Sequence, residues 1–416
     1  MHEFRYKHNE LYCESKAIKE LAKRYGTPLY VYSKKTLLDH YRKIRDAFKS
    51  IHPLVCYSMK ANSNSAICRS LVKDGAGLDI VSGGELYRAL RTGVSPRKIV
   101  YAGVGKKEEE IKTAIKSNIL LFNVESLPEL DAINRVSARL NRRQEVAIRI
   151  NPDIKPKTHR YITTGHGQNK FGMDMDTAKD IFLHRSRFKN LDIVGVHLHI
   201  GSQIVNSGPF LKAIKRIAGF VRKLEDSRIK IKYFNIGGGL GIIYSHERPQ
   251  TAREYAEAVL PILKKIGSKV ILEPGRFIAG NSGVLVTEVL YIKKTPQKNF
   301  AIVDAGMNDL VRPSLYEAYH EVLPVRSAKY NAKETIRRYD VVGPICESGD
   351  FLGKDRKFIN LKKGDLLSHM GAGAYGFSMS SNYNSRPRAA EVLVDGARAR
   401  SIRSRETYRD LVRTEV

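Results

Sequence analysis

A lysine and a glutamate that lie far apart in the sequence each stand at the end of a short apolar run. Lys60 follows the run Val55–Met59, and Glu273 follows the run Val270–Leu272. A lysine amine can bond covalently to a carbonyl carbon, and a carboxylate can hold a protonated ring nitrogen. If the fold brings the two side chains together, they indicate a cofactor that carries both groups.

Two glycine turns provide a place for a phosphate group on such a cofactor. Gly237-Gly238-Gly239 follows the run Tyr233–Ile236, and Gly275 lies in the segment Glu273-Pro274-Gly275-Arg276 after the next run. In a barrel of eight βα units, the loops after strands seven and eight form the usual phosphate site. The two turns therefore predict a phosphorylated cofactor.

Apolar runs rich in β-forming residues recur through the middle of the chain. The segments between them, such as Glu108–Ile115 and Phe210–Leu224, have helical spacing, so strands alternate with helices. Several runs have little polar alternation, as expected of strands covered on both faces. Eight units over roughly 240 residues favour a (β/α)8 TIM barrel over an open doubly wound sheet. The eight predicted strands are Val55–Met59, Leu78–Val81, Lys98–Ala102, Leu120–Val124, Val146–Ile150, Ile193–His199, Tyr233–Ile236 and Val270–Leu272.

The barrel, predicted over residues 36–280, does not fill a chain of 416 residues, so a second domain is expected. From residue 281 to 416, short strands are broken by Gly, Pro and Asn, and few long helices separate them, which predicts an antiparallel β domain. Its predicted strands are Val284–Ile292, Phe300–Val303, Asp340–Val342 and Glu391–Leu393. Residues 1–35 contain a helical stretch, Ser15–Tyr25, and a strand, Pro28–Ser33. We expect this N-terminal segment to associate with the C-terminal β domain.

Closure of a barrel places its eighth strand beside its first, so Lys60 and Glu273 are expected at the same mouth. Barrel enzymes keep their catalytic groups at these carboxyl ends of the strands. A lysine with an acidic partner for a pyridinium nitrogen is the arrangement that pyridoxal 5'-phosphate (PLP) requires, because the protonated ring stabilises a carbanion. The sequence therefore predicts PLP as the cofactor.

A histidine pair, His197 and His199, ends the sixth predicted strand and projects on one face. Such a pair can bind a metal ion, but no third His or Cys stands at a comparable strand end within a known motif. We therefore expect no metal site. The favoured interpretation is a flat imidazole over the cofactor ring, with Ser202 near the phosphate.

Composition limits the other possibilities. The formal net charge is +29, but the basic residues are spread along the chain and no zinc finger, RNP motif or basic aromatic helix is present. We interpret the charge as a solvated basic surface and expect no nucleic-acid partner.

No apolar run has the length of about 20 residues that a membrane span needs, so no membrane association is expected. The N-terminus has no signal-like stretch and the four cysteines have no zinc spacing, which favours the cytoplasm.

The motifs described above, together with several segments of the C-terminal part, resemble those of the diaminopimelate decarboxylases. This family belongs to the alanine-racemase-like, barrel-fold class of PLP enzymes. The resemblance covers nearly the whole chain, and the order of the segments is more specific than any one of them. The segments are Tyr57–Asn62, Asp79–Glu85, His197–Gln203, Gly237–Gly241, Glu273–Arg276, Gly343–Asp350, Gly373–Tyr375 and Ser381–Asn384. Asn235 departs from the pattern, because many relatives carry Asp before the triple glycine.

The resemblance implies a role for each matching residue. Lys60 would bond to the cofactor, Glu273 would bind its ring nitrogen, and His199 would stack on the ring. Cys346 would donate the proton that replaces the lost carboxylate, and it would reach the site from the partner subunit together with Glu347. Further cofactor contacts would come from Asp79, Ser202, Gly238, Gly275, Arg276 and Tyr375. Substrate contacts would come from Arg276, Arg312, Tyr316, Glu347 and Tyr375.

The implied activity is the decarboxylation of meso-2,6-diaminopimelate to L-lysine and CO2, the last step of lysine biosynthesis, by a homodimer with shared active sites. An ornithine or arginine decarboxylase of the same fold is the main alternative, although such relatives usually have Cys-Asp where this chain has Cys346-Glu347. Alanine racemases are shorter, and the noncatalytic PLP-binding barrels lack a C-terminal β domain. A nucleic-acid-binding protein is an alternative that rests on charge alone.

Overall fold

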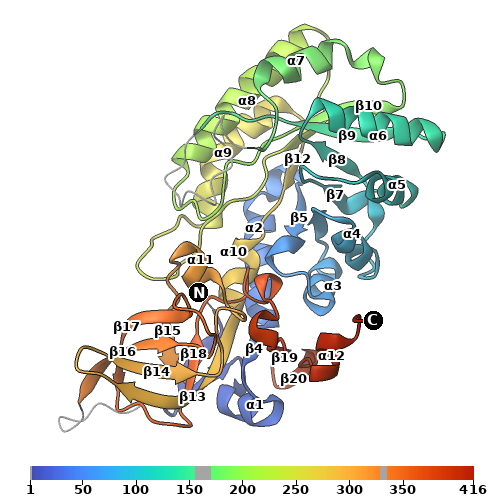
Figure 1. Cartoon of the computed structure of the whole chain (residues 1–416). Coiled ribbons are helices and arrows are strands. Elements are labelled where there is room, and N and C mark those ends of the chain that lie inside the picture. The colour runs from blue at the N-terminus through green and yellow to red at the C-terminus, as the bar shows by residue number, and fades with distance from the viewer. Residues whose placement is uncertain (1, 155–169, 328–334) are drawn as a thin grey trace. The chain divides into compact units, whose positions relative to one another are not determined.

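The computed structural model describes residues 2–154, 170–327 and 335–416, and the chain divides into two compact units (Figure 1). One unit comprises His40–Ile242 and Arg248–Phe277. The other comprises Met1–Asp39, Ile243–Glu247 and Ile278–Val416. Each unit has its own buried apolar cluster, as expected of separate domains.

The first unit is a closed barrel of parallel strands in the order β10-β11-β12-β5-β6-β7-β8-β9, which confirms the predicted TIM barrel. Its strands are β5 (Leu54–Ser58), β6 (Gly77–Ile80), β7 (Ile99–Tyr101), β8 (Leu121–Val124), β9 (Gln144–Arg149), β10 (Leu191–His197), β11 (Tyr233–Asn235) and β12 (Lys269–Leu272). The barrel closes where Ile271 of β12 pairs with Leu54 of β5. The last predicted strand therefore lies beside the first.

A buried cluster of side chains joins most strands of the barrel. Cys56, Val100, Ala147 and Tyr233, from β5, β7, β9 and β11, belong to it together with Leu121 of β8 and Ile271 of β12. The centre of a TIM barrel is a packed core and not a pore. The catalytic groups of this unit must therefore lie at an end of the strands, above a packed core.

The helices of this unit lie around the barrel (Figure 1) and are α3 (Ser65–Lys73), α4 (Gly83–Leu90), α5 (Glu108–Lys116), α6 (Leu127–Arg139), α7 (Met175–Leu183), α8 (Gly208–Asp226) and α9 (Ala252–Ile266). Their local signals agree with their positions. Thr251 accepts a hydrogen bond from the Glu254 amide, and the Glu254 carboxylate accepts one from the Thr251 amide. This capping box stabilises the start of α9 by about 1 kcal/mol. Helix α2 (Lys34–Ala47) begins in the other unit and ends in the barrel unit.

The second unit is built on a sheet with the order β17-β16-β14-β13-β4-β19-β20, and β18 joins it by pairing with β13 and β15. Its elements are β4 (Leu29–Ser33), β13 (Gly283–Lys294), β14 (Asn299–Val303), β15 (Val322–Pro324), β16 (Ile336–Val342), β17 (Phe351–Ile359), β18 (Leu366–His369), β19 (Ala390–Asp395) and β20 (Arg398–Arg403). A small sheet of β1 (Phe4–Lys7), β2 (Glu10–Cys13) and β3 (Lys16–Ala17) precedes helix α1 (Ile18–Tyr25). Three short helices complete the unit, namely α10 (Arg276–Ala279), which begins in the barrel unit, α11 (Arg312–Tyr316) and α12 (Tyr408–Val412).

The sheet of the second unit is mixed, whereas the sequence predicts an antiparallel one. Strand β14 runs parallel to β16, and β4 runs parallel to β19. Antiparallel neighbours can be joined by a tight hairpin, but parallel neighbours need a long connection. Here the chain between β14 and β16 contains α11 and β15, and β4 and β19 come from opposite ends of the sequence, so neither pair is constrained by a hairpin.

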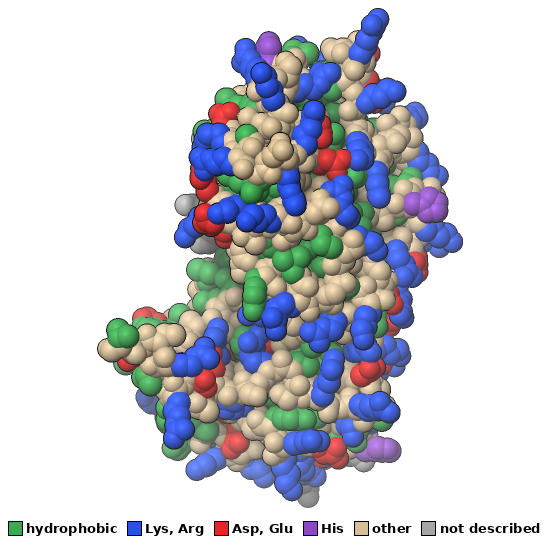
Figure 2. Space-filling view, turned by 90° about the vertical axis from the view of Figure 1, so that its right-hand side faces the viewer, with side chains coloured by type: hydrophobic (Ala, Val, Ile, Leu, Met, Phe, Trp, Pro, Cys, Tyr) green, Lys and Arg blue, Asp and Glu red, His purple; other side chains and the backbone are tan. Residues whose placement is uncertain are grey.

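Charged side chains cover the face of the molecule in Figure 2, where Lys and Arg are scattered over the surface with Asp and Glu between them. The charge is spread over this face in the same way as it is spread along the sequence. Among the described helices, none combines the length and the apolar composition that crossing a membrane requires.

Candidate active site

Lys60 lies directly after the first barrel strand, in the short turn Met59–Ala61 that follows β5. Its amine is 3.7 Å from Oδ2 of Asp79, which is buried at the end of β6. Ser58 also donates a short hydrogen bond to this carboxylate. Burial and the negative charge of Glu273 raise the pKa of Asp79 to about 8, although Lys60 opposes the shift. Asp79 thus provides the lysine with an acidic neighbour at the mouth of the barrel.

Glu273 follows the last barrel strand and is 5% exposed. Its Oε1 accepts hydrogen bonds from the side-chain amides of Asn235, at 2.6 Å, and Asn123, at 2.9 Å. Its Oε2 is 3.1 Å from Nε2 of His197. Burial alone would raise the pKa of Glu273, but His197, Asn235 and Lys60 outweigh burial and lower that pKa to about 2. The carboxylate is therefore an anion within a buried site.

His199 is held by the glycine turn that follows β11. The amide of Gly238 donates to Nδ1 of His199 at 3.2 Å, so the remaining proton of the neutral ring is on Nε2. Burial, with the positive charges of Lys60 and Arg149, lowers the pKa of His199 well below its usual range. The result is a neutral, flat imidazole at the mouth of the barrel.

The glycine turns fit closely against the strand ends, and only glycine is accommodated at the contact points. A Cβ atom on Gly238 would lie 2.1 Å from the carbonyl oxygen of Glu273. A Cβ atom on Gly275 would lie 3.0 Å from Cβ of Ser58. Glycine turns after strands seven and eight stand where a TIM barrel usually forms its phosphate site.

Two polar side chains lie beside these turns. Arg276 begins α10 after the Glu273 turn, and its Nε donates to Oγ of Ser202 at 3.1 Å. A guanidinium offers donors in a planar fork, which suits it to bind a phosphate or a carboxylate. The loops after β10, β11 and β12 thus hold a glycine turn, a hydroxyl and a cation, and this set of groups fits the phosphate of PLP.

The other unit contains the remaining residues that the sequence singles out. Arg312 begins α11 and is 5% exposed. Its Nη1 donates to Nε2 of His320 at 2.8 Å, and its guanidinium lies 4.5 Å from the centre of the Tyr244 ring. Nδ1 of His320 in turn donates to the backbone oxygen of Met370 at 2.7 Å. Arg312 is therefore a buried arginine that is held in place by contacts within this unit.

Cys346 and Glu347 form an exposed corner of this unit. The amide of Cys346 donates to Oδ1 of Asn384 at 2.8 Å. Asp350 shapes the corner by accepting from the amides of Ile345, at 2.7 Å, and Met307, at 2.6 Å. The Cys346 thiol is therefore presented to solvent by a loop with defined hydrogen bonds.

Two tyrosines complete the predicted set. Tyr316 ends α11 and is partly buried, and Tyr375 is partly buried with a backbone φ of +57°. Lys60, Asp79, His199, Ser202, Gly238, Glu273, Gly275 and Arg276 thus belong to the barrel unit, where contacts link neighbouring members. Arg312, Tyr316, Cys346, Glu347 and Tyr375 belong to the other unit.

Several polar residues of the site were not assigned a role from the sequence. Asn123 lies one residue before the end of β8, Asn235 ends β11, and both contact Glu273. The sequence offers His197 as a metal ligand, but its partner in the structure is Glu273. The signal in the sequence is a polar residue at or near the end of an otherwise apolar strand. Among the described residues, no group of three or more His, Cys, Asp or Glu side chains is arranged to hold a metal ion.

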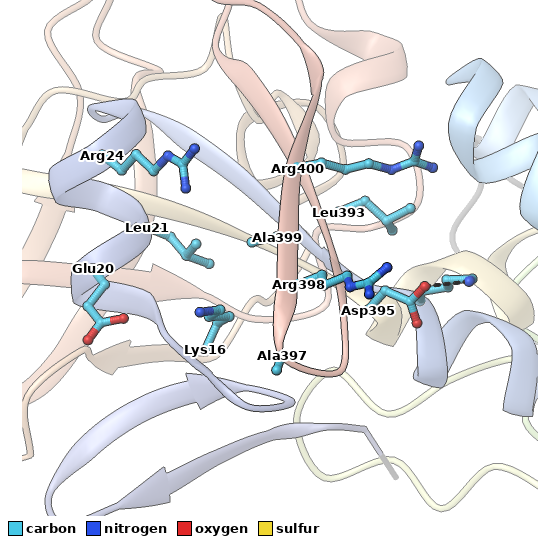
Figure 3. Close-up of a pocket in the computed structure, with 11 residues that line it drawn as sticks. Lys16, Glu20, Leu21, Arg24, Leu393, Asp395, Ala397, Arg398, Ala399 and Arg400 are labelled. Atoms are coloured by element: carbon cyan, nitrogen blue, oxygen red, sulfur yellow. Dashed lines mark hydrogen bonds and ion pairs between the residues drawn. The ribbon is translucent and has the colours of Figure 1, made fainter.

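A separate cavity of about 710 Å³ lies in the second unit beside α1 and the β19–β20 turn (Figure 3). A dashed line in the figure marks the ion pair of Lys34 with Asp395, at 2.6 Å. The charged side chains that line this cavity are Lys16, Glu20, Arg24, Lys34, Asp395, Arg398 and Arg400. None of these charged side chains is buried, so the cavity is a solvated hollow in a basic surface.

A TIM barrel with a lysine after its first strand, an anionic carboxylate after its last, and glycine turns after strands seven and eight is the construction of the barrel-fold PLP enzymes. Residues 34–280 match the family model described as "Pyridoxal-dependent decarboxylase, pyridoxal binding domain". The diaminopimelate decarboxylase of Aquifex aeolicus is 48% identical over 404 residues, which cover 97% of this chain and 95% of the relative. That of Vibrio cholerae is 46% identical over 403 residues, with the same two coverages of 97% and 95%.

Solved structures agree with the sequence comparison. The diaminopimelate decarboxylase of Helicobacter pylori, complexed with L-lysine, superposes with a TM-score of 0.91 at 42% identity, over 95% of this chain and 98% of that one. The enzyme of M. jannaschii, in co-complex with L-lysine, has a TM-score of 0.93 at 38% identity, over 99% and 97%. The chain belongs to the pyridoxal-dependent decarboxylase family and, within it, to the diaminopimelate decarboxylases. Its cofactor is PLP, which confirms the prediction from the sequence.

Proposed function

We propose that this chain removes one carboxylate of meso-2,6-diaminopimelate as CO2 and releases L-lysine, the last step of lysine biosynthesis. The observation that carries the proposal is that Lys60 and an anionic Glu273 follow two strands, β5 and β12, that pair with each other. This arrangement occurs in a chain that is 48% identical to a diaminopimelate decarboxylase. The fold alone would also suit an ornithine or arginine decarboxylase, so the substrate must be tested directly.

When bound, the cofactor supplies an electron sink for the bond pair left by the departing CO2. In our proposal Lys60 would hold the cofactor covalently. Glu273 would keep the ring nitrogen protonated, because a buried anion stabilises a nearby positive charge. His199 would lie against the ring, and its neutral state would avoid a second cation there. Asp79, beside Lys60, is a further group near the bond to the cofactor.

The phosphate would be held by Gly238, Gly275, Ser202 and Arg276, with Tyr375 as a further contact. The hydrogen bond between Arg276 and Ser202 supports this assignment, because it brings two members of the set together.

The distal end of the substrate is itself an amino acid, with a carboxylate and an ammonium group. We propose that Arg312, assisted by Arg276, Tyr316 and Tyr375, binds the carboxylate, because a guanidinium offers two parallel hydrogen bonds. Glu347 would bind the ammonium group. Cys346 would donate the proton to the carbon that loses CO2. With these roles, each charged group at the distal end of the substrate would meet a side chain of opposite charge.

We further propose that Cys346 and Glu347 act in the site of a second copy, so that the active form is a homodimer with shared sites. The exposure of both residues on a structured corner supports this arrangement. All four cysteines are free, which supports a reducing, cytoplasmic location.

The test is direct. PLP-loaded protein is incubated separately with meso-diaminopimelate, L-ornithine and L-arginine, and CO2 release and the amine product are followed. We expect L-lysine from diaminopimelate, with a kcat/KM at least about a hundredfold above that for the other two, equivalent to roughly 2.7 kcal/mol. A higher rate with ornithine or arginine would instead identify the alternative decarboxylase.

A further inference from the structure

The carboxylate of Glu273 has three hydrogen-bond donors around it, and their number is informative. An ionised carboxylate offers about four lone-pair sites. Asn123 and Asn235 occupy both sites on Oε1, and His197 occupies one on Oε2. Among the described residues, no other donor reaches Oε2, so one acceptor site remains there.

The orientation of the two amides is fixed by their other contacts. Asn235 accepts from the amide of Gly237 at 2.9 Å through its Oδ1, so its NH2 group must face Glu273. Asn123 accepts from the side-chain amide of Asn235 at 3.5 Å through its Oδ1, so its NH2 group also faces Glu273. Oε1 is therefore bound by two donors that cannot exchange roles.

His197 binds Oε2 of Glu273 through one nitrogen of its ring, and the other ring nitrogen has no partner among the described residues. Because an ionised carboxylate only accepts, Nε2 of His197 must carry the hydrogen that points to Oε2. The ring is 1% exposed, and its Nδ1 has no hydrogen-bond partner in the described part of the chain. Burial of a polar ring costs free energy unless its hydrogen bonds offset that cost. Within the described ranges, the hydrogen bond to Glu273 is the only one that this buried ring makes.

We propose that His197 is a positioning residue, which holds Oε2 of Glu273 so that its remaining lone pair points at the ring nitrogen of the cofactor. The inference rests on the proposed role of Glu273 in binding that nitrogen. The terminal torsion of a glutamate is broad, so the two amides on Oε1 alone leave the direction of the opposite oxygen poorly defined. His197 supplies the constraint that fixes it.

A purely structural role for His197 leads to different expectations. A core histidine that only fills space would be replaced by an apolar residue with a loss of stability, and the electronic state of the cofactor would not change. A positioning residue would be replaced without loss by a side chain that keeps its donor. H197L and H197M remove the donor, and H197Q offers an amide N–H in its place, so the variants separate the two roles.

The primary measurement is the nitrogen-15 NMR signal of PLP labelled at the ring nitrogen and bound to each variant, because this signal reports protonation of that nitrogen. We expect the signal to move toward the unprotonated position in H197L and H197M, and to stay near the wild-type position in H197Q. H369L is the matched control, since His369 is also fully buried and neither ring nitrogen has a partner among the described residues. Its signal should equal that of the wild type.

Kinetics provide the second readout. We expect kcat for meso-diaminopimelate to fall at least about tenfold in H197L, or about 1.4 kcal/mol, while KM stays within about threefold. H197Q should recover most of this loss. If the donor-free variants bind PLP with an unchanged nitrogen signal while E273Q moves it, His197 is not a positioning residue and the role of Glu273 stands. If E273Q also leaves the signal unchanged, the proposed role of Glu273 itself is wrong.

Discussion

Arg312 donates a hydrogen bond to His320 across 2.8 Å, and the histidine accepts it through Nε2. A ring nitrogen that accepts must be unprotonated, so the proton of His320 is on Nδ1, which donates to the carbonyl of Met370 at 2.7 Å. A neutral imidazole thus orients a buried cation, and the Tyr244 ring packs on the face of that cation. The guanidinium is restricted in both direction and tilt, which suits two-pronged binding of a carboxylate.

Replacement of Arg312 tests whether this oriented cation selects the substrate. Arg312→Ala should lower kcat/KM for meso-diaminopimelate at least about a hundredfold, roughly 2.7 kcal/mol, because the distal carboxylate loses its partner. Arg312→Lys should recover little of this loss, since an ammonium cannot form the two-pronged contact. PLP content, measured by absorbance, should not change. Unaltered kinetics with diaminopimelate would make Arg312 a structural arginine.

Replacement of His320 tests whether the orientation of Arg312 matters apart from its charge. His320→Met removes the acceptor, whereas His320→Gln offers an amide oxygen in its place. We expect KM for meso-diaminopimelate to rise at least about fivefold in His320→Met, with kcat changed less than about twofold, because binding and not chemistry is impaired. His320→Gln should lie closer to the wild type. Equal KM values in both variants would mean that the hydrogen bond has no part in substrate binding.

The covalent attachment of the cofactor is tested by reduction. Purified protein should be yellow, and borohydride should fix PLP to a peptide that contains Lys60, because this amine lies at a strand end beside Asp79. Mass spectrometry of a digest identifies the labelled residue. Lys106 serves as an internal comparison, since it is buried in an ion pair and should remain unlabelled. A label on any lysine other than Lys60 would refute the assignment.

Glu273→Gln should retain PLP but slow decarboxylation strongly. A neutral amide cannot keep the ring nitrogen protonated, and electrostatic effects of this kind are worth on the order of 3 kcal/mol or more. The measurement is kcat under saturating substrate, with PLP content determined in the same sample. Turnover at nearly the wild-type rate would show that the pyridinium has no need of this carboxylate.

Shared sites are tested by mixing two inactive variants. Lys60→Ala and Cys346→Ala subunits, mixed under conditions that allow exchange, should regain part of the wild-type activity, because a mixed dimer can build one intact site. Subunit exchange is verified independently with a labelled chain. If exchange occurs and activity does not return, each site is made within a single chain.

The barrel could be predicted from the sequence because its strands are buried on both faces and read as continuous apolar runs. The predicted run Val270–Leu272, for example, differs from β12 by one residue at its start. The order of strands then placed Lys60 and Glu273 at one mouth, and the pairing of β12 with β5 confirms it. The apolar runs and the rule that a closed barrel places its last strand beside its first were sufficient to predict the barrel.

The second unit was predicted less completely, because its sheet depends on pairings between distant segments. Strand β17, Phe351–Ile359, was not predicted, since its polar residues obscure the alternation. The place of β4 could not be read locally, because its two neighbours lie some 250 and 360 residues further along the chain. His320 lies only eight residues from Arg312, but no local pattern predicts their contact, which depends on the left-handed residue Glu317 that ends α11 between them.

The central position of β4 in its sheet has a consequence for synthesis on the ribosome. This strand, Leu29–Ser33, emerges early, but it lies between β13 and β19, and β19 ends at Asp395. Folding of nascent chains proceeds domain by domain as segments emerge. The barrel can therefore close while translation continues, whereas β4 cannot complete its pairing until Ala390–Asp395 has left the exit tunnel.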